Sequence, residues 1–163
     1  SAMSEDSDRF TDNGDGTLTD TRYNLMWLKE DFYQIKDKWC SWKGANKFVD
    51  KLNEDKFAGW DDWRLPKNKE ARNLYDHDCK NMDFDDDIVH IDYMFPEGCG
   101  STYWCCEEKG HLAMAYNYYS DRGYHVRKKA KEDGNMTCRP VRSSGPKVQV
   151  SDRTSLTGRS RRE

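Results

Sequence analysis

The sequence predicts an α+β domain that combines two helices with a small, mostly antiparallel sheet. Three observations support this fold class. Short β-type segments flank a turn near the N-terminus, two stretches with helical spacing follow, and short apolar segments separated by glycines fill the C-terminal half. Strands and helices that are segregated along a chain in this way are typical of α+β domains.

The N-terminal turn is the segment Asn13-Gly14-Asp15-Gly16, between residues 9–12 and 17–20. Asn-Gly and Asp-Gly pairs favour tight turns, so these segments predict a β-hairpin. The aspartates also raise the possibility of calcium. An EF-hand loop, however, needs Gly at its sixth position, and counting from Asp12 places Thr17 there. We therefore expect no calcium site in this hairpin.

The middle of the chain contains the two expected helices. Ser41 is a suitable N-cap for the first, and its apolar residues recur at helical spacing. They are Trp42, Ala45, Phe48, Val49 and Leu52. The second helix is expected over residues 68–76, after Pro66.

The expected strands lie on both sides of these helices, and their sheet is expected to join the two ends of the chain. They are residues 25–28, 103–104, 113–116, 124–126 and 137–142. Large aromatic side chains bury much area per residue, so Trp27, Trp63 and Trp104 are predicted to lie in the core.

A length of 163 residues fits one domain. Its predicted bounds are residues 9–142, with a flexible tag or leader at 1–8 and a basic tail at 143–163, where Val148 and Val150 could add an edge strand. No apolar run approaches the roughly 18 residues that a membrane span needs, so membrane insertion is not expected.

Charge is distributed unevenly along the chain. Residues 76–92 contain seven Asp and one Lys, whereas residues 122–163 contain twelve Lys or Arg and four acidic residues. This asymmetry permits an anionic partner at the C-terminal end, but a solvated surface with a basic tail is the favoured explanation. No nucleic-acid partner is expected.

Six cysteines form an even set that could pair in an oxidising compartment or remain as free thiols. They are Cys40, Cys79, Cys99, Cys105, Cys106 and Cys138. A zinc site made of His77, Cys79, His90 and Cys99 is conceivable, but its spacing matches no common structural zinc pattern. We therefore expect no metal and no cofactor.

Several blocks of this sequence resemble the Lcl C-terminal domain family over residues 9–142. These blocks are residues 9–20, Leu25-Met26-Trp27, Asp62-Trp63-Arg64-Leu65-Pro66 with Glu70, Phe95-Pro96, Tyr103-Trp104 and Cys138-Arg139-Pro140-Val141-Arg142. The resemblance implies a C-type lectin-like fold, related to formylglycine-generating-enzyme-like domains. It also implies ligand binding, because the family includes adhesin modules and variable proteins of diversity-generating retroelements.

The chain departs from the family pattern at two places. Lys67 stands where the family commonly has a Thr that caps the second helix, so Asn68 or nothing must cap it. Cys105 and Cys106 replace a Ser pair near the presumed binding face. The tripeptides of calcium-dependent sugar recognition, such as Glu-Pro-Asn, are missing from the sequence, which argues against that mode of binding.

The predicted binding surface lies in the segment between Cys105 and Asn135, which is rich in Tyr, Asn and Ser. Such residues form adaptable contact surfaces. The candidate residues are Cys105, Cys106, Tyr116, Asn117, Tyr118, Tyr119, Arg122, Tyr124 and His125. An alternative remains open for Tyr116 and Tyr118, because alternate residues of a strand can face the core.

The function predicted from these observations is ligand recognition, with a variable-type surface for protein ligands displayed at a cell or virion surface. The alternative partner is a surface glycan: an adhesin module would bind sulfated polysaccharide through the basic C-terminal part. A thiol-dependent enzyme that uses Cys105 and Cys106 is the least favoured alternative, because no motif places a nucleophile beside a base. We therefore expect that the protein is not an enzyme.

Overall fold

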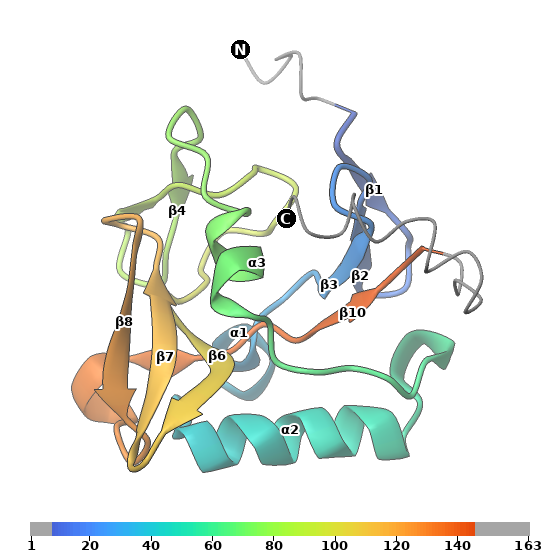
Figure 1. Cartoon of the computed structure of the whole chain (residues 1–163). Coiled ribbons are helices and arrows are strands. Elements are labelled where there is room, and N and C mark those ends of the chain that lie inside the picture. The colour runs from blue at the N-terminus through green and yellow to red at the C-terminus, as the bar shows by residue number, and fades with distance from the viewer. Residues whose placement is uncertain (1–7, 146–163) are drawn as a thin grey trace, which may run out of the picture.

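The computed structural model describes residues 8–145, which form a mixed α+β domain (Figure 1). Its strands are β1 (Phe10–Asp12), β2 (Thr17–Asp20), β3 (Leu25–Leu28), β4 (Asn81–Met82), β5 (Ile88–Val89), β6 (Thr102–Lys109), β7 (Leu112–Asn117), β8 (Arg122–Arg127), β9 (Met136–Thr137) and β10 (Val141–Ser143). Its α-helices are α1 (Phe32–Lys36), α2 (Trp42–Glu54) and α3 (Asn68–Arg72), and 3-10 turns lie at Phe57–Gly59 and Glu132–Gly134. The predicted α+β class is confirmed.

The first sheet has the order β1-β2-β3-β10 and joins the start of the domain to its end. The predicted hairpin is present, with Phe10 opposite Asp20. The guanidinium of Arg9 holds the hairpin closed through two hydrogen bonds to the Asp20 carboxylate, of 2.9 and 2.7 Å. Strand β10 returns antiparallel to β3, so the expectation that one sheet joins the chain ends is also confirmed.

The second sheet has the order β8-β7-β6-β9 and occupies the opposite side of the domain (Figure 1). Strands β6, β7 and β8 form an antiparallel meander, and β9 pairs parallel to β6. Instead of the single small sheet that was predicted, the described residues thus form two four-stranded sheets and the short β4-β5 pair.

The helices differ from the prediction in number and length. The helix behind Ser41 is present, and the Ser41 hydroxyl accepts the Gly44 N–H. The predicted helix 68–76 ends at Arg72. Helix α1 was not predicted, because five residues with one buried side chain, Phe32, carry no apolar periodicity.

The core forms two clusters, one on each face of the second sheet. Between this sheet and α2 lie Trp104, Ala113 and Ala115, together with Trp63. The other face packs on α3 and on the first sheet, where Trp27 is buried. The prediction that Trp27, Trp63 and Trp104 belong to the core is confirmed, since each is at most 3% exposed.

The structure also describes the cysteines and the residues that were considered for a zinc site. All six cysteines are free thiols. Within residues 8–145, no three His, Cys, Asp or Glu side chains are close enough to hold a metal ion, so the considered zinc ligands do not form a group. No helix in the same range is long and apolar enough to cross a membrane. Most of the predicted leader and tail, including Val148 and Val150, lies outside the described residues.

Candidate recognition surface

The nine predicted surface residues do not form one patch. Cys105, Tyr116 and Tyr118 are buried in the core, at most 3% exposed, so their prediction as surface residues was wrong. The cause is the alternation of side chains along a strand: Cys105 and Tyr116 point to the face that packs on α3. The Tyr118 hydroxyl donates a 2.6 Å hydrogen bond to the Ala71 carbonyl of α3, so this tyrosine anchors the helix to the sheet.

Asn117 shapes the turn that leads from β7 to β8. Its side-chain oxygen accepts the backbone N–H groups of Tyr119 and Ser120, at 2.9 and 3.0 Å. Its amide group donates to the Thr102 hydroxyl. With both ends of its amide occupied, Asn117 serves the turn rather than a ligand.

Tyr119 lies on this turn with 39% of its surface exposed. Its hydroxyl donates a hydrogen bond to the Asp83 carboxylate, which also accepts the backbone N–H groups of Asp85 and Asp87. Partial burial, followed by the bond to Asp83, raises the pKa of Tyr119 to about 12. The ring is therefore exposed, neutral at physiological pH, and held in place at its far end.

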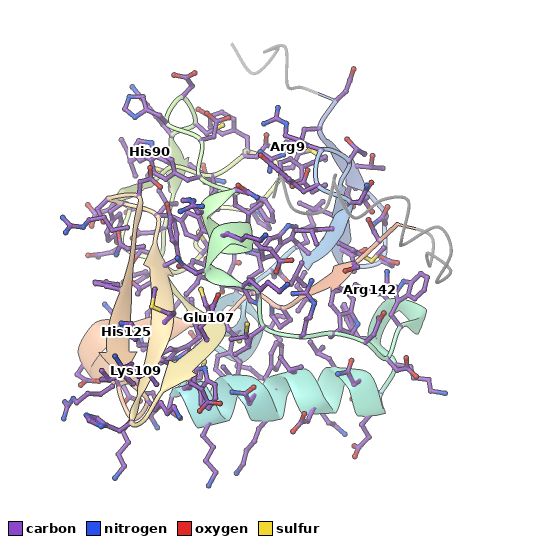
Figure 2. All side chains as sticks on the ribbon, in the orientation of Figure 1. Arg9, His90, Glu107, Lys109, His125 and Arg142 are labelled. Atoms are coloured by element: carbon purple, nitrogen blue, oxygen red, sulfur yellow. The ribbon has the colours of Figure 1, made fainter. Side chains whose placement is uncertain are left out.

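Strand β8 carries Arg122, Tyr124 and His125, all of which are exposed. Tyr124 lies opposite Ala115, on the sheet face that packs on α2, and shares this face with Arg122. His125 lies opposite Met114 and points to the other face. Figure 2 shows His125 at the outer margin of the sheet. The candidate residues on β8 thus project to both sides of the strand.

Position 123, between Arg122 and Tyr124 on β8, favours glycine for a steric reason. It lies opposite Tyr116, beneath the start of α3. A Cβ atom at position 123 would lie 2.5 Å from Oδ1 of Asn68, so a side chain there would force the Asn68 side chain to move. Gly123 therefore lets α3 pack directly on β8.

Cys106 lies in an irregular part of β6, where the pairing with β7 shifts register between Trp104 and Glu108. Its backbone N–H donates to the Pro66 carbonyl, and its thiol is exposed. Partial desolvation, followed by the charge of Glu107, raises the pKa of Cys106, and burial raises the pKa of Cys105 well above the ordinary value. Both thiols are therefore protonated at neutral pH, and the protonated thiol is the weak form of the nucleophile.

A groove of about 590 Å³, which the sequence did not predict as a site, lies beside the end of β8. It is lined by Ser41, Trp42, Lys43 and Asn46 from the start of α2 and by Lys128, Lys129 and Lys131 after β8. The Lys128 ammonium lies 4.6 Å from the centre of the Trp42 ring and also pairs with Glu108. The Trp42 indole donates to the Cys105 carbonyl, so its ring is fixed in the groove wall.

This groove lies between two segments more than eighty residues apart, which are joined by a 3.0 Å hydrogen bond from the backbone N–H of Trp42 to the Lys128 carbonyl. The run of basic residues at 127–131 was visible in the sequence. Trp42 was assigned to the apolar stripe of its helix, where it does pack partly against the core. Only the tertiary contact shows that its ring also meets the lysines.

Residues 16–142 match the family model described as the Lcl C-terminal domain. This chain belongs to the Lcl C-terminal domain family. The matched span begins inside the β1-β2 hairpin and includes β8 and the whole groove. No curated protein matches this chain.

In this Lcl C-terminal domain, the Trp-Arg-Leu-Pro block has a structural role. The Asn53 side chain of α2 accepts a hydrogen bond from the backbone N–H of Trp63 at 2.7 Å and donates one to the Trp63 carbonyl at 2.9 Å. Arg64 makes a two-point ion pair with Glu70 of α3, at 2.7 and 3.0 Å. The block therefore connects α2 to α3.

The C-terminal block of this Lcl C-terminal domain is equally structural. Arg139 is buried and donates to the carbonyl groups of Leu28 and Lys29. Arg142 pairs with Asp62 at 2.6 Å, and its guanidinium lies 3.6 Å from the centre of the Trp60 ring. Arg139 therefore fastens the segment before β10 to the end of β3, and Arg142 fastens β10 to the segment before Trp63.

Proposed function

We propose that this domain is a ligand-binding module with a C-type lectin-like fold, and that its contact face is built on β8 and the turns beside it. The fold proposal is supported by family membership and by the first sheet, which joins both ends of the domain. One contrast carries the functional proposal. Five of the six β8 residues are exposed, whereas the neighbouring β7 contributes to both core clusters.

This contrast matters because a recognition surface must vary without loss of the fold. Side chains that touch no core residue change stability by about 0.5 kcal/mol or less when substituted. Arg122, Tyr124 and His125 meet this requirement, since their side chains are exposed. Tyr119 is exposed as well, although its hydroxyl bonds to the buried Asp83 carboxylate. Tyrosine and arginine also dominate protein interfaces, which favours a protein ligand.

The proposal extends to the origin of the surface: β8 and its flanks would be the variable segment of a diversity-generating retroelement protein. A reverse-transcriptase gene and a near-copy of the coding segment for residues 103–142 beside this gene would support that origin. The proposal assigns no catalytic role. The raised pKa values of Cys105 and Cys106 favour this choice, because a thiol-dependent enzyme needs a thiolate.

The test replaces Tyr119, Arg122, Tyr124 and His125 together with Ser or Ala. A protein array first supplies a ligand for the parent chain. The variant should remain folded, with a melting temperature lowered only by the lost Tyr119–Asp83 hydrogen bond. It should lose at least about tenfold in affinity, since a single interface anchor contributes about 2 kcal/mol or more. Unchanged affinity would refute the proposed surface.

A matched control exists elsewhere on the domain. Tyr23, Tyr93, Arg72 and His77 have the same composition as the test set and are also exposed. Their joint replacement should leave affinity unchanged. A loss in this control equal to that in the test set would show that the contact face lies away from β8.

The groove beside β8 favours a second candidate function, the binding of sulfated polysaccharide. Lysine ammonium groups attract sulfate, and the flat face of Trp42 suits the apolar face of a sugar ring. The N-terminus of α2 adds positive potential at the same place. These elements supply both the charge and the surface that a sulfated sugar needs.

Heparin and an uncharged dextran distinguish this candidate. Heparin should bind at low salt and weaken as salt rises, because salt screens exposed charges, and dextran should not bind. The variant Lys43→Gln, Lys129→Gln, Lys131→Gln should lose this binding. A charge-matched control, Lys36→Gln, Lys38→Gln, Lys80→Gln, changes exposed lysines outside the groove and should keep it. Equal losses in both variants would indicate only nonspecific attraction.

A further inference from the structure

Strand β8 is an open edge of its sheet. It is the terminal strand in the order β8-β7-β6-β9 and pairs only with β7. Among the described residues, no backbone hydrogen bond outside this ladder involves residues 122–126. Figure 1 shows β8 at the outer margin of the sheet. Its outward N–H and C=O groups are therefore available to another strand.

The length of the edge is sufficient for strand addition. Six residues form β8, which equals a typical strand in a globular protein. In an antiparallel ladder alternate residues direct their backbone groups to one neighbour, so the other half of the β8 groups point outward. An extended segment of similar length would satisfy them, as in other domains that bind peptides by adding a strand.

The charges of β8 argue against a second copy of this chain as the occupant. Arg122 and Arg127 mark the two ends of the strand. The six residues of β8 include these two arginines and no acidic residue, so two paired β8 strands would bring four arginines together without a carboxylate between them. Like charges on neighbouring strands repel each other, which destabilises such a pair. The acidic residue beside Arg127, Asp133, is 3.9 Å away and largely exposed, so it neutralises little of this charge.

The same charges favour an acidic strand. Arg122 and Arg127 are five residues apart and therefore point to opposite faces. An incoming antiparallel strand would complement both with two acidic residues at the same spacing, one on each face. Between them lies the exposed ring of Tyr124, which can pack on a β-branched residue of the new strand.

We propose that β8 binds an extended acidic segment of a partner protein as an added antiparallel strand, in which two carboxylates five residues apart pair with Arg122 and Arg127. This inference rests on the proposed function in that it takes β8 as the contact strand. It adds the class of partner and the backbone geometry of binding.

The probe is a fluorescein-labelled peptide, Glu-Thr-Val-Thr-Val-Glu, and the measurement is fluorescence anisotropy with the whole chain. The peptide should bind, and its Lys-for-Glu counterpart should not. N-methylation of alternate amides gives two further peptides. One series removes the N–H groups that face β8 and should weaken binding by about tenfold or more, since each lost hydrogen bond contributes about 1 kcal/mol. The other series should bind as the parent peptide does.

The protein variant Arg122→Gln, Arg127→Gln should weaken binding of the acidic peptide, while Lys36→Gln, Lys38→Gln should not. Moving the two Glu residues of the peptide to a spacing of four, which places both on one face, should also weaken it. Equal tolerance of both N-methylated series, no binding at about 1 mM peptide, or self-association of the chain through β8 would overturn the inference. Each of these outcomes leaves the four-residue replacement as a separate test of the proposed function.

Discussion

Glu107 of β6 accepts the backbone N–H of Asn68, the first residue of α3, with N···O distances of 3.1 and 3.0 Å to its two carboxylate oxygens. The residue before the helix, Lys67, has no side-chain acceptor for the free N–H groups of the first turn. The helix is therefore capped by a strand 39 residues further along the chain. The negative charge of the Glu107 carboxylate also interacts favourably with the positive N-terminal end of the helix dipole.

We expect Glu107→Ala to lower the free energy of unfolding by about 1 kcal/mol, the usual contribution of a helix cap. Urea unfolding measures the change, and Glu97→Ala, at an exposed position, is the control. Adding Lys67→Thr to Glu107→Ala should recover most of the loss, because Thr caps the helix locally. Failure of this double variant to recover stability would show that Glu107 acts by another route.

Replacement of Trp104 by Ala should cost about 3 to 5 kcal/mol, the usual range for a buried large aromatic side chain. Trp104 is fully buried, and its indole N–H donates to the Cys40 carbonyl at 2.9 Å. If the Ala variant does not fold, Trp104→Phe provides a measurable intermediate. Trp60→Ala, at a 42% exposed side chain, should cost about 1 kcal/mol or less, the contribution of its contact with Arg142. Comparable losses at positions 60 and 104 would contradict the assignment of the core.

One thiol should react rapidly with a thiol reagent in the folded protein. Cys106 is exposed, whereas the other five cysteines are buried. A titration with Ellman's reagent should therefore give one fast equivalent, and denaturant should release the rest. Because desolvation and Glu107 raise the pKa of Cys106, its rate should reach half of its maximum at a higher pH than that of free cysteine. Cys106→Ser should abolish the fast phase, and a fast phase that persists in this variant would disprove the assignment.

Stability should fall in alkaline solution. Burial raises the pKa of Cys99 from 9.0 to about 11, so the unfolded chain releases this proton at a lower pH than the folded chain does. The stabilising contribution is complete below the unfolded pKa and is lost as the pH rises towards the folded value. Urea unfolding between about pH 8 and about pH 10.5 should show a decline that is shallower in Cys99→Ala. A parent protein whose stability is constant over this range would contradict the raised pKa.

The sequence predicted those parts of the fold that local chemistry determines. The turn at residues 13–16 and the N-cap Ser41 with its apolar stripe have short-range signals, and both are present. Helix α1 has no such signal. Its cap, Asp31, is buried and accepts hydrogen bonds from Gly100 N–H and the Tyr103 hydroxyl, contacts that exist only in the folded chain.

The binding surface was predicted in part, because composition marks a segment but not the direction of each side chain. Tyr116 and Tyr124 belong to the same tyrosine-rich stretch, yet the first is 1% and the second 45% exposed. Strand alternation separates such residues only after the register is known. The groove at Trp42 depends on a contact with Lys128 that no local pattern encodes.

The close approach of Gly123 to Asn68 has a practical consequence for directed evolution of this domain. A library that randomises β8 to obtain new specificities should keep position 123 as glycine, because any larger residue there meets the amide of Asn68. Shortening Asn68 to Ala in the parent would relax this restriction and open a further position to selection. Enriched clones with a side chain at 123 should then arise only in the Asn68→Ala background.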